Sequence, residues 1–476
     1  MDEPTRIGQV SRREVLKKGL LGAAGLTVLP TVLAACSSTA ATPTVAPTPT
    51  PPPVGTPAPT PTPGAETPAP TPAGLTGTVS LGSNYSDAIP KKAMADMATA
   101  FTAKTTVAVT INTVDHGTFQ NQITSYLGGK PEDVFTWFSG FRMRFFAAQN
   151  LAVPIDDVWT TLTANYSDAF KVGSTGDDTH QYFVPIYNYP WAVFYRKSLF
   201  TAKGYTVPTT MDEFKALCTK MQTDKIVPIA FADKDGWPAM GTFDILNLRM
   251  NGYQFHVDLM AGKQKWTDPK VIAVFNMWKD LMPFHQSGAA GRIWQDAAQA
   301  LIKKTAGMYL LGMFVSQQFK AVDDATLADL DFFPFPNLGT EFDAEKALDA
   351  PIDGFMIAAK SAAGQAGQDQ TNAKAFVGFL GTGAAQDIYV AADPSNIAAA
   401  KDADTSKYNA LQQKAVQLIG SAQKITQFMD RDTRPDFATS TGMQNFILKF
   451  ISNPSQDLTA LMTQVQAFWD GLPPAS

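Results

Sequence analysis

Aromatic and polar side chains occur where several predicted strands of this chain end. Trp137 follows a short buried-strand candidate, and Trp237 lies in the loop 234–238. Tyr85 follows the first predicted strand and Asp115 follows the second. Ligands of α/β proteins bind at such strand ends. Because an aromatic face packs on C–H groups while hydroxyl and carboxylate groups pair with a polar rim, this combination favours a sugar ligand.

A further polar candidate is Arg431, in the segment Met-Asp-Arg-Asp at 429–432. Its guanidinium group is suited to binding hydroxyl or carboxylate groups of a ligand. In the alternative interpretation, Asp430, Arg431, Asp432 and Arg434 pair only with each other on a solvated turn, where ion pairs contribute little. Both interpretations are open from the sequence.

No catalytic set of residues is apparent. A glycosidase needs two carboxylates that face one bond, but every glutamate of the folded body lies at a predicted helix start, turn or surface position: Glu132, Glu213, Glu341 and Glu345. The four histidines are isolated, and neither H-E-x-x-H nor G-x-S-x-G occurs. We therefore expect no enzyme, no metal site and no cofactor.

Length and charge narrow the class of protein. A chain of 476 residues is too long for one ordinary core, so two domains are expected. The net charge of −5 and the charged fraction of 17% describe an acidic, soluble surface without the basic stripe that phosphate contacts need. Nucleic acid is therefore not an expected partner.

The first residues resemble an export signal. Residues 11–17 read S-R-R-E-V-L-K, which is similar to the twin-arginine pattern with Val15 in place of phenylalanine, and a weakly apolar run covers residues 19–35. That run is too short and too rich in glycine for a membrane span. Leu-Ala-Ala before Cys36 resembles a lipobox. We predict a signal peptide at 1–35 and lipidation of Cys36.

The segment 36–74 predicts a tether. After Cys36 it consists almost wholly of Ala, Thr, Pro, Ser and Gly, so it cannot bury enough apolar surface to fold. Proline-dense chains favour the extended polyproline II conformation. A lipid, a spacer and a folded body predict an exported protein that is anchored at the outer face of the cytoplasmic membrane. Cys218, the other cysteine, is expected to be a buried, inert thiol.

From Leu75 the pattern changes to strands that alternate with amphipathic helices, which indicates an α/β body. Residues 78–81 and 106–111 read as strands, and residues 89–101 between them read as a helix, so together they predict a βαβ unit. Further along, Thr209 or Thr210 is suited to cap a helix.

The order of landmarks in residues 75–470 resembles the extracellular solute-binding family that includes maltose-binding protein. The segments that carry the resemblance are DVF to PIDD at 133–157, YFVPIYNYPWAVFYRK at 182–197, LF to EF at 199–214 and APIDGFMIA at 350–358. The resemblance implies an α/β fold with two lobes, of the type II periplasmic-binding-protein kind, with mixed, mostly parallel sheets and a hinge of several strands.

The resemblance also implies where the lobes divide. One lobe would hold residues 75–188 plus 350–393, and the other 192–337 plus 396–476. The chain would cross between them near 187–193, 337–352 and 390–397. A hinge of this kind closes when ligand contacts from both lobes favour the closed state.

The crossings add candidate site residues. Trp191 and Asn188 lie at the first crossing, and Asp353 lies in the strand that would re-enter the first lobe. Phe314 occupies the position of a cleft tryptophan in the family, after Gly312. The remaining tryptophans fall on helices or their ends and are expected in the core: Trp159, Trp266, Trp278, Trp294 and Trp469.

The function that the resemblance implies is capture of a mono- or oligosaccharide by a monomeric receptor, which delivers it to the permease subunits of an ABC importer. Three alternatives remain open. The same scaffold binds iron or polyamines in some relatives, for which Tyr187 and Tyr189 are candidate ligands. A carbohydrate-active hydrolase or lyase and an adhesive or structural lipoprotein are the other two.

Overall fold

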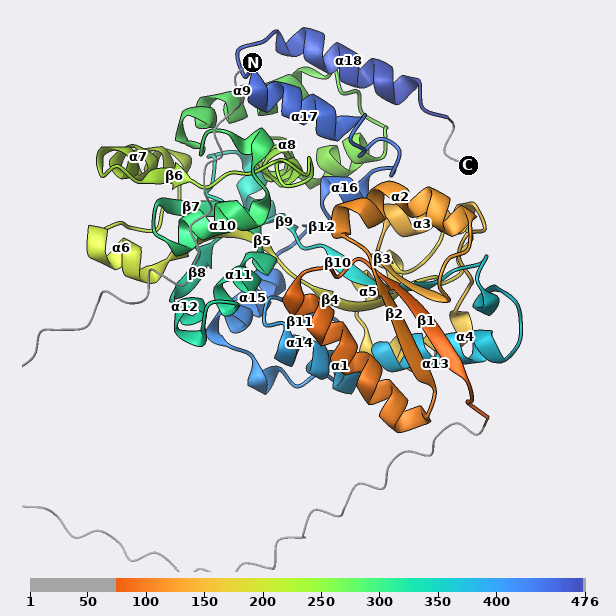
Figure 1. Cartoon of the computed structure of the whole chain (residues 1–476). Helices are drawn as coiled ribbons and strands as arrows, with labels where there is room; N and C mark the ends of the chain where they lie inside the picture. Colours follow the sequence, from red (N-terminus) through yellow and green to blue (C-terminus); the bar gives the residue numbers. More distant parts are fainter. Residues whose placement is uncertain (1–73, 474–476) are drawn as a thin grey trace, which may run out of the picture. The chain divides into compact units, whose positions relative to one another are not determined.

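Two mixed β-sheets organise the part of the chain that the computed structural model describes, residues 74–473 (Figure 1). The predicted signal peptide, Cys36 and almost all of the predicted tether lie outside the described residues. None of the helices within residues 74–473 combines the length and the apolar character needed to cross a bilayer.

The first sheet has six strands in the order β11-β4-β10-β3-β1-β2. Its members are β1 (Thr78–Ser83), β2 (Ala108–Thr113), β3 (Val134–Phe138), β4 (Val184–Asn188), β10 (Ile352–Ile357) and β11 (Ile397–Ala398). β1 pairs in parallel with both β2 and β3, and α1 (Ala88–Thr105) connects β1 to β2. The predicted βαβ unit is therefore confirmed.

The second sheet has four strands in the order β6-β7-β5-β8: β5 (Trp191–Arg196), β6 (Val227–Ile229), β7 (Ala306–Gly312) and β8 (Leu330–Phe333). A two-stranded parallel pair, β9 (Leu348–Asp349) and β12 (Ile425–Thr426), accompanies the sheets. Both sheets are mixed, as predicted, but the prediction that they are mostly parallel is wrong: five of their eight strand pairs are antiparallel, because β4, β5 and β10 run against their neighbours.

The chain passes from the first sheet to the second through residues 189–190, between the end of β4 and the start of β5. It returns from β8 to β10 by way of β9. Both passages fall within crossing segments that the family resemblance implies. The exact lobe boundaries remain a prediction.

Helices surround the sheets, and α1, α13 and α14 lie together against the first sheet (Figure 1). The α-helices after α1 are α2 (His116–Gly128), α3 (Phe141–Ala148), α4 (Asp156–Leu162), α5 (Asp168–Gly173), α6 (Lys197–Lys203), α7 (Met211–Thr223), α8 (Met240–Met260), α9 (Pro269–Leu281), α10 (Trp294–Ile302), α11 (Ser316–Lys320), α12 (Asp324–Asp329), α13 (Gln368–Leu380), α14 (Gly383–Ala392), α15 (Ala410–Ser421), α16 (Met429–Asp432), α17 (Met443–Ser452) and α18 (Leu458–Asp470).

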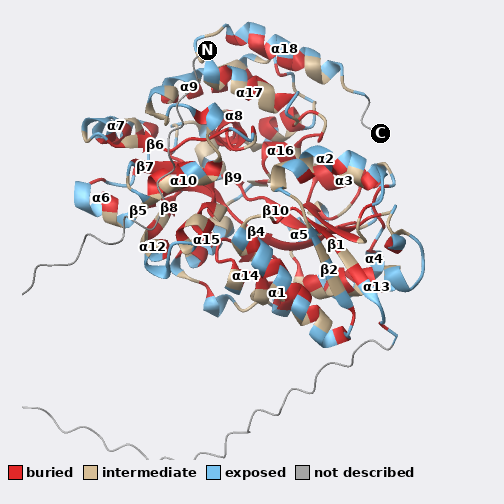
Figure 2. Ribbon diagram, in the orientation of Figure 1, coloured by how far each residue is buried: buried red, intermediate tan, exposed pale blue. Residues whose placement is uncertain are grey.

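Burial follows the periodicity of the sequence, and Figure 2 shows buried residues along the strands and the inner helix faces. In α1 the residues Met94, Met97 and Phe101 are buried, at the spacing that places them on one helix face.

Cys218 is buried in α7, and burial raises the pKa of its thiol to about 12. The expected burial of this thiol is confirmed, and its raised pKa favours the expected inert state.

Helix α7 begins with a capping box on Thr210. Its hydroxyl accepts a hydrogen bond from the Glu213 N–H group, and the Glu213 carboxylate accepts one from the Thr210 N–H group. We expect Thr210→Ala to lower the free energy of unfolding by about 1 kcal/mol. Thr219→Ala on the same helix is the control, because alanine there raises helix propensity and should not destabilise. Denaturant midpoints measure both; equal losses would contradict the cap assignment.

A buried carboxyl group lies on β9, the strand through which the chain returns to the first sheet. Asp349 is fully buried, and one of its oxygens accepts a hydrogen bond from the Thr426 hydroxyl. Burial raises the pKa of Asp349 to about 7, and the charge of Asp432 adds to this while Arg249 opposes it. The folded protein therefore holds a costly buried charge above that pH.

Asp349→Asn should stabilise the protein in a pH-dependent way. Because the folded pKa of Asp349 lies above the unfolded one, its contribution to stability is present at low pH and is lost as pH rises through about 7. Asparagine keeps an acceptor for Thr426 and carries no charge. We expect the variant to melt higher than the parent at about pH 8, with an advantage that shrinks as the pH falls below about 7 and is lost only near the unfolded pKa of about 4. Asp369→Asn, on an exposed helix start, should show no such trend.

Candidate functional site

A cavity of about 240 Å³ lies where loops from both sheets meet. The segments after β1 and β2 line it from the first sheet, and the segments after β6 and β7 line it from the second. The rest of the wall comes from the crossing, the start of α10, β10, the residue before β11 and the segment around α16: Tyr187, Tyr189, Trp191, Ile293, Trp294, Gln295, Asp353, Asn396, Phe428, Asp430 and Arg431. Strand ends of two sheets therefore converge on one site, as α/β architecture favours.

Seven of the nine ligand-binding residues that the sequence predicts line this cavity. They are Tyr85, Asp115, Trp191, Trp237, Phe314, Asp353 and Arg431. The remaining two, Trp137 and Asn188, are not part of its lining.

Trp137 and Asn188 are held away from the cavity by the strands that contain them. β3 extends to Phe138, so Trp137 lies inside this strand rather than after it. Its indole donates to the Arg142 carbonyl at 3.3 Å and packs on Phe146 with the ring centroids 5.5 Å apart. Asn188 is buried at the end of β4, between β10 and β11. The prediction that these two residues line the ligand site does not agree with the structure.

Aromatic rings form much of the cavity wall. Trp191 stacks on Phe428, with ring centroids 4.8 Å apart and planes inclined by 16°. Phe314 meets Trp237 edge-on at 5.7 Å and Trp294 at 5.1 Å. Such rings offer apolar faces of defined orientation to a ligand. Trp294 is buried in the core, as expected, and as the first residue of α10 it also lines the cavity.

Arg431 lies between two buried carboxylates. One guanidinium N–H group donates to Asp353, and Nε lies 3.6 Å from Asp430 Oδ1. The guanidinium carbon also lies 3.9 Å from the ring centroid of Phe138. Asp353 accepts a second hydrogen bond, from the Tyr187 hydroxyl at 3.0 Å. Since Arg431 is only 5% exposed, the alternative of a solvated turn is wrong.

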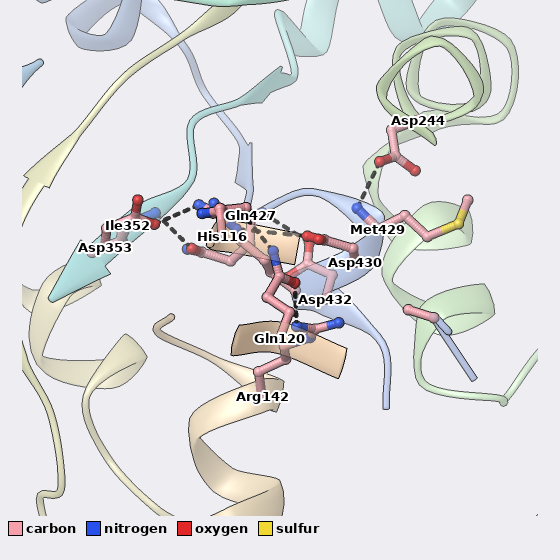
Figure 3. Close-up of polar contacts among 12 residues, drawn as sticks. His116, Gln120, Arg142, Asp244, Ile352, Asp353, Gln427, Met429, Asp430 and Asp432 are labelled. Carbon is pink, nitrogen blue, oxygen red and sulfur yellow. Dashed lines mark hydrogen bonds and ion pairs between the residues drawn. The ribbon is translucent and has the colours of Figure 1, made fainter. Parts of the chain in front are cut away.

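The segment 427–432 is fixed from several sides (Figure 3). The Gln427 side chain accepts a hydrogen bond from the Ile352 N–H group at 2.9 Å, and the Met429 N–H group donates to Asp244 at 2.6 Å. Between them Phe428 adopts a φ of 144°, a value that is costly for any residue with a side chain. These bonds hold the strained backbone that places the Phe428 ring on Trp191.

Two side chains at the edge of the site have shifted pKa values. Burial, followed by the charge of Arg431, lowers the pKa of His116 to about 4, so this histidine is neutral at pH 7. Its Nε2 lies 2.7 Å from the Gln120 amide nitrogen and accepts its hydrogen bond (Figure 3). Asp115 caps α2, and the hydrogen bond from the Thr118 N–H group lowers the pKa of its carboxyl group. The mouth of the cavity thus carries a neutral imidazole and a charged carboxylate.

Several buried polar atoms of the lining lack a hydrogen-bond partner among the described residues. They include Asn84 Nδ2, Asp430 Oδ1 and Arg431 Nε. The Asn84 amide is oriented by Thr136, whose hydroxyl donates to its oxygen at 3.0 Å. Because unpaired buried polar atoms are costly, such atoms indicate a polar ligand. A molecule with several hydroxyl groups both donates and accepts, so it suits a lining of this composition.

Sequence reasoning missed other residues of the lining. Several of the missed residues are neighbours in sequence of predicted site residues, and this proximity could have identified them. The others could be identified only from the tertiary structure. The missed residues include Asn84, Asp87, His116, Asp235, Trp294, Gln295, Gln317, Asn396, Phe428 and Asp430. In the part of the chain that the structure describes, no group of three or more His, Cys, Asp or Glu side chains is placed to hold a metal ion.

Known proteins with similar sequences are receptors of transporters. An uncharacterised ABC transporter extracellular-binding protein of Pyrococcus horikoshii is 26% identical over 301 residues, which cover 62% of this chain and 65% of that protein. The alpha-glucosides-binding periplasmic protein AglE of Rhizobium meliloti is 26% identical over 290 residues, which cover 55% of this chain and 60% of AglE. The chain thus spans less than two-thirds of these curated relatives.

Solved structures agree with the predicted fold. The bacterial solute receptor AcbH, which has an exclusive substrate preference for β-D-galactopyranose, is 45% identical with a TM-score of 0.79, over 83% of this chain and 98% of that one. A chitin oligosaccharide binding protein has a TM-score of 0.74 at 18% identity, over 83% of this chain and 98% of that one. The fold is the two-lobed type II periplasmic-binding-protein kind.

The model of the bacterial extracellular solute-binding protein family matches residues 82–387. This span contains both sheets except β11 and the first four residues of β1, and it includes most of the cavity lining. Together with the similarity to AcbH, it shows that this chain belongs to the bacterial extracellular solute-binding protein family.

Proposed function

We propose that this protein is the solute receptor of an ABC importer and that it captures a monosaccharide without converting it. The observation that carries the proposal is the cavity, whose lining residues combine aromatic faces with unpaired buried polar atoms. Aromatic rings pack on the C–H faces of a pyranose, and hydroxyl groups satisfy both donors and acceptors. This pairing of surfaces suits a sugar better than it suits a purely apolar or purely ionic ligand.

The size of the cavity favours one sugar ring. Its volume of about 240 Å³ lies below the roughly 300–1,000 Å³ of clefts that take drug-sized ligands. The sequence left mono- and oligosaccharides equally open. The receptor AcbH prefers a single hexopyranose, β-D-galactopyranose. We therefore propose D-galactose or a closely related hexose as the cargo.

Isothermal titration calorimetry of the purified protein tests this proposal. The panel is D-galactose, D-glucose, maltose, spermidine and ferric citrate, and chromatography after overnight incubation tests for sugar products. Saturable binding of one hexose with no product supports the proposal. Binding of spermidine or iron alone would replace the ligand class, and product formation would show an enzyme.

Iron is a poorer candidate, although Tyr187 and Tyr189 line the cavity. A tyrosine binds a ferric ion as a phenolate. Burial raises the pKa of Tyr187 well above its ordinary value and also raises that of Tyr189. The Tyr187 hydroxyl moreover donates to Asp353 at 3.0 Å, so its proton is engaged.

Catalysis is also a poorer candidate. Asp353 and Asp430 are the buried carboxyl groups of the lining, and a glycosidase would need one of them as a proton donor. Burial raises the pKa of each, but the charge of Arg431 opposes protonation of both. Since one guanidinium group engages the two carboxylates, they are arranged as an ion cluster rather than as an acid and a nucleophile.

We further propose that the protein is exported, held to the membrane by a lipid on Cys36 and docked on permease subunits as a monomer. Cys36 and the signal motif lie outside the described residues, so the sequence alone supports this part. We expect Cys36→Ser to move the protein from the membrane fraction to the soluble exported fraction. Cell fractionation with Cys218→Ser as the control measures this; membrane association of both variants would contradict the lipid anchor.

A further inference from the structure

The charged side chains that line the cavity are almost all acidic. The carboxylates of the lining are Asp87, Asp115, Asp235, Asp353 and Asp430, whereas Arg431 is its one guanidinium group and no lysine or glutamate contributes. His116 adds no charge at pH 7, because burial and then the charge of Arg431 lower its pKa to about 4. Five carboxylates against one guanidinium leave a clear excess of negative charge around the ligand.

The positive charge deep in the cavity is already neutralised by protein groups. Arg431 donates to Asp353 and lies 3.6 Å from Asp430, and all three residues are buried. Asp430 Oδ1 makes no hydrogen bond among the described residues beyond its 3.6 Å ion pair with Arg431, so it keeps capacity to accept one from a donor. A second cation, Arg142, acts on Asp430 but is not part of the lining.

The mouth of the cavity carries three more carboxylates from separate segments. Asp87 precedes α1, Asp115 caps α2, and Asp235 lies in the loop before Trp237. Burial and then the charge of Asp115 raise the pKa of Asp235, and Asp115 also adds to the rise that burial causes at Asp87. Lys234 beside Asp235 is the cation that opposes this charge. Asp115 is therefore close enough to act on both Asp87 and Asp235.

From this arrangement we infer that the receptor selects uncharged monosaccharides and rejects their anionic counterparts, namely sugars that carry a carboxylate or a phosphate. The inference rests on the proposed function and assigns the substrate class of the same site. An anionic sugar would meet like charge at the mouth, and in the interior it would compete with Asp353 and Asp430 for Arg431. Unfavourable charge contacts of this kind are a common source of specificity.

The test uses calorimetry to compare the affinities of three sugars that differ at one carbon: D-galactose, D-galacturonate and its uncharged counterpart D-galacturonamide. A glucose series of glucose, glucuronate and glucuronamide is measured in parallel. We expect galacturonate to bind at least about 100-fold more weakly than galactose. Galacturonamide should bind much closer to galactose, because it has nearly the shape of the uronate without its charge.

Variants separate the charge of the cavity from the charge of the whole protein. Asp115→Asn with Asp235→Asn removes two charges at the mouth, and asparagine at 115 retains the ability to cap α2. We expect this double variant to bind the uronate at least about tenfold more tightly than the parent does. Asp369→Asn, which removes an exposed charge outside the lining, should leave the preference unchanged.

The outcomes distinguish the two proposals. If galactose binds and the uronate binds within about threefold of it, charge selection is wrong while the sugar receptor stands. If the uronate and its amide are rejected equally, size rather than charge selects, and the inference again fails. If no neutral sugar of either series binds, the proposed function fails and the inference fails with it.

Discussion

Replacement of Arg431 by methionine is expected to lower the free energy of unfolding by about 3–5 kcal/mol. The residue is 5% exposed, and its guanidinium group contacts two buried carboxylates, Asp353 and Asp430. Removal of the cation leaves both carboxylates buried without their opposite charge, which costs more than the ion cluster itself contributes. The same change should abolish measurable sugar binding, because Asp353 and Asp430 line the cavity.

Denaturant titration and calorimetry measure the two effects of Arg431→Met. Arg144→Met is the matched control, because Arg144 on α3 donates to backbone carbonyls at the surface and lies outside the lining. It should cost about 1 kcal/mol or less. Adding Asp353→Asn to Arg431→Met should restore part of the lost stability, since it removes one of the stranded charges. A loss of stability that Asp353→Asn does not relieve would contradict the role of the ion cluster.

Predictions of site residues were correct where the residue lies beyond the end of a strand and wrong where it lies inside the strand. Asp115 and Trp237 lie in loops that follow strands, as predicted, and both line the cavity. The prediction for Trp137 was wrong because β3 continues to Phe138, so the ring lies within the strand and packs on α3. Element boundaries are the least reliable part of any sequence-based assignment.

Arg431 shows a second limit. The sequence around Arg431 is compatible with a solvated turn and with a binding site, because the neighbouring aspartates are able to form ion pairs with the guanidinium group in both. The partner that decides the matter is Asp353, which lies 78 residues earlier in the chain. Periodicity and helix caps are local signals, so they predicted the βαβ unit and the start of α7. A contact between distant segments could be predicted only from the family resemblance or seen in the structure.

Trp294 and Phe428 were missed for a related reason. Trp294 begins α10, and a helix with this apolar pattern predicts that its tryptophan faces the core. The ring does pack on Phe314, but the first turn of α10 opens on the cavity, so one residue serves both purposes. Phe428 owes its position to a backbone φ of 144°, which no residue pattern predicts.

Trp237→Ala is expected to weaken binding of the cognate sugar by about 30-fold or more, which corresponds to about 2 kcal/mol. Trp237 is partly exposed, and its ring meets Phe314, His116 and Phe428 only edge-on or at a steep angle. Gly236, which precedes Trp237 in its loop, has a φ of 78°, a conformation that glycine adopts readily. Since few ring faces are engaged within the protein, the loss of the indole should affect ligand contacts more than the free energy of unfolding.

Trp469→Ala provides the matched control for Trp237→Ala. Trp469 on α18 is also partly buried, but it packs on Phe437 with ring centroids 4.7 Å apart and is not part of the cavity lining. We expect the opposite pattern there, with lower thermal stability and unchanged sugar affinity. Trp237→Phe should recover part of the affinity, because a smaller aromatic face remains at the same place. If Trp237→Ala and Trp469→Ala changed affinity and stability alike, the indole of Trp237 would be a packing residue, and the aromatic wall of the site would rest on Trp191 and Phe314.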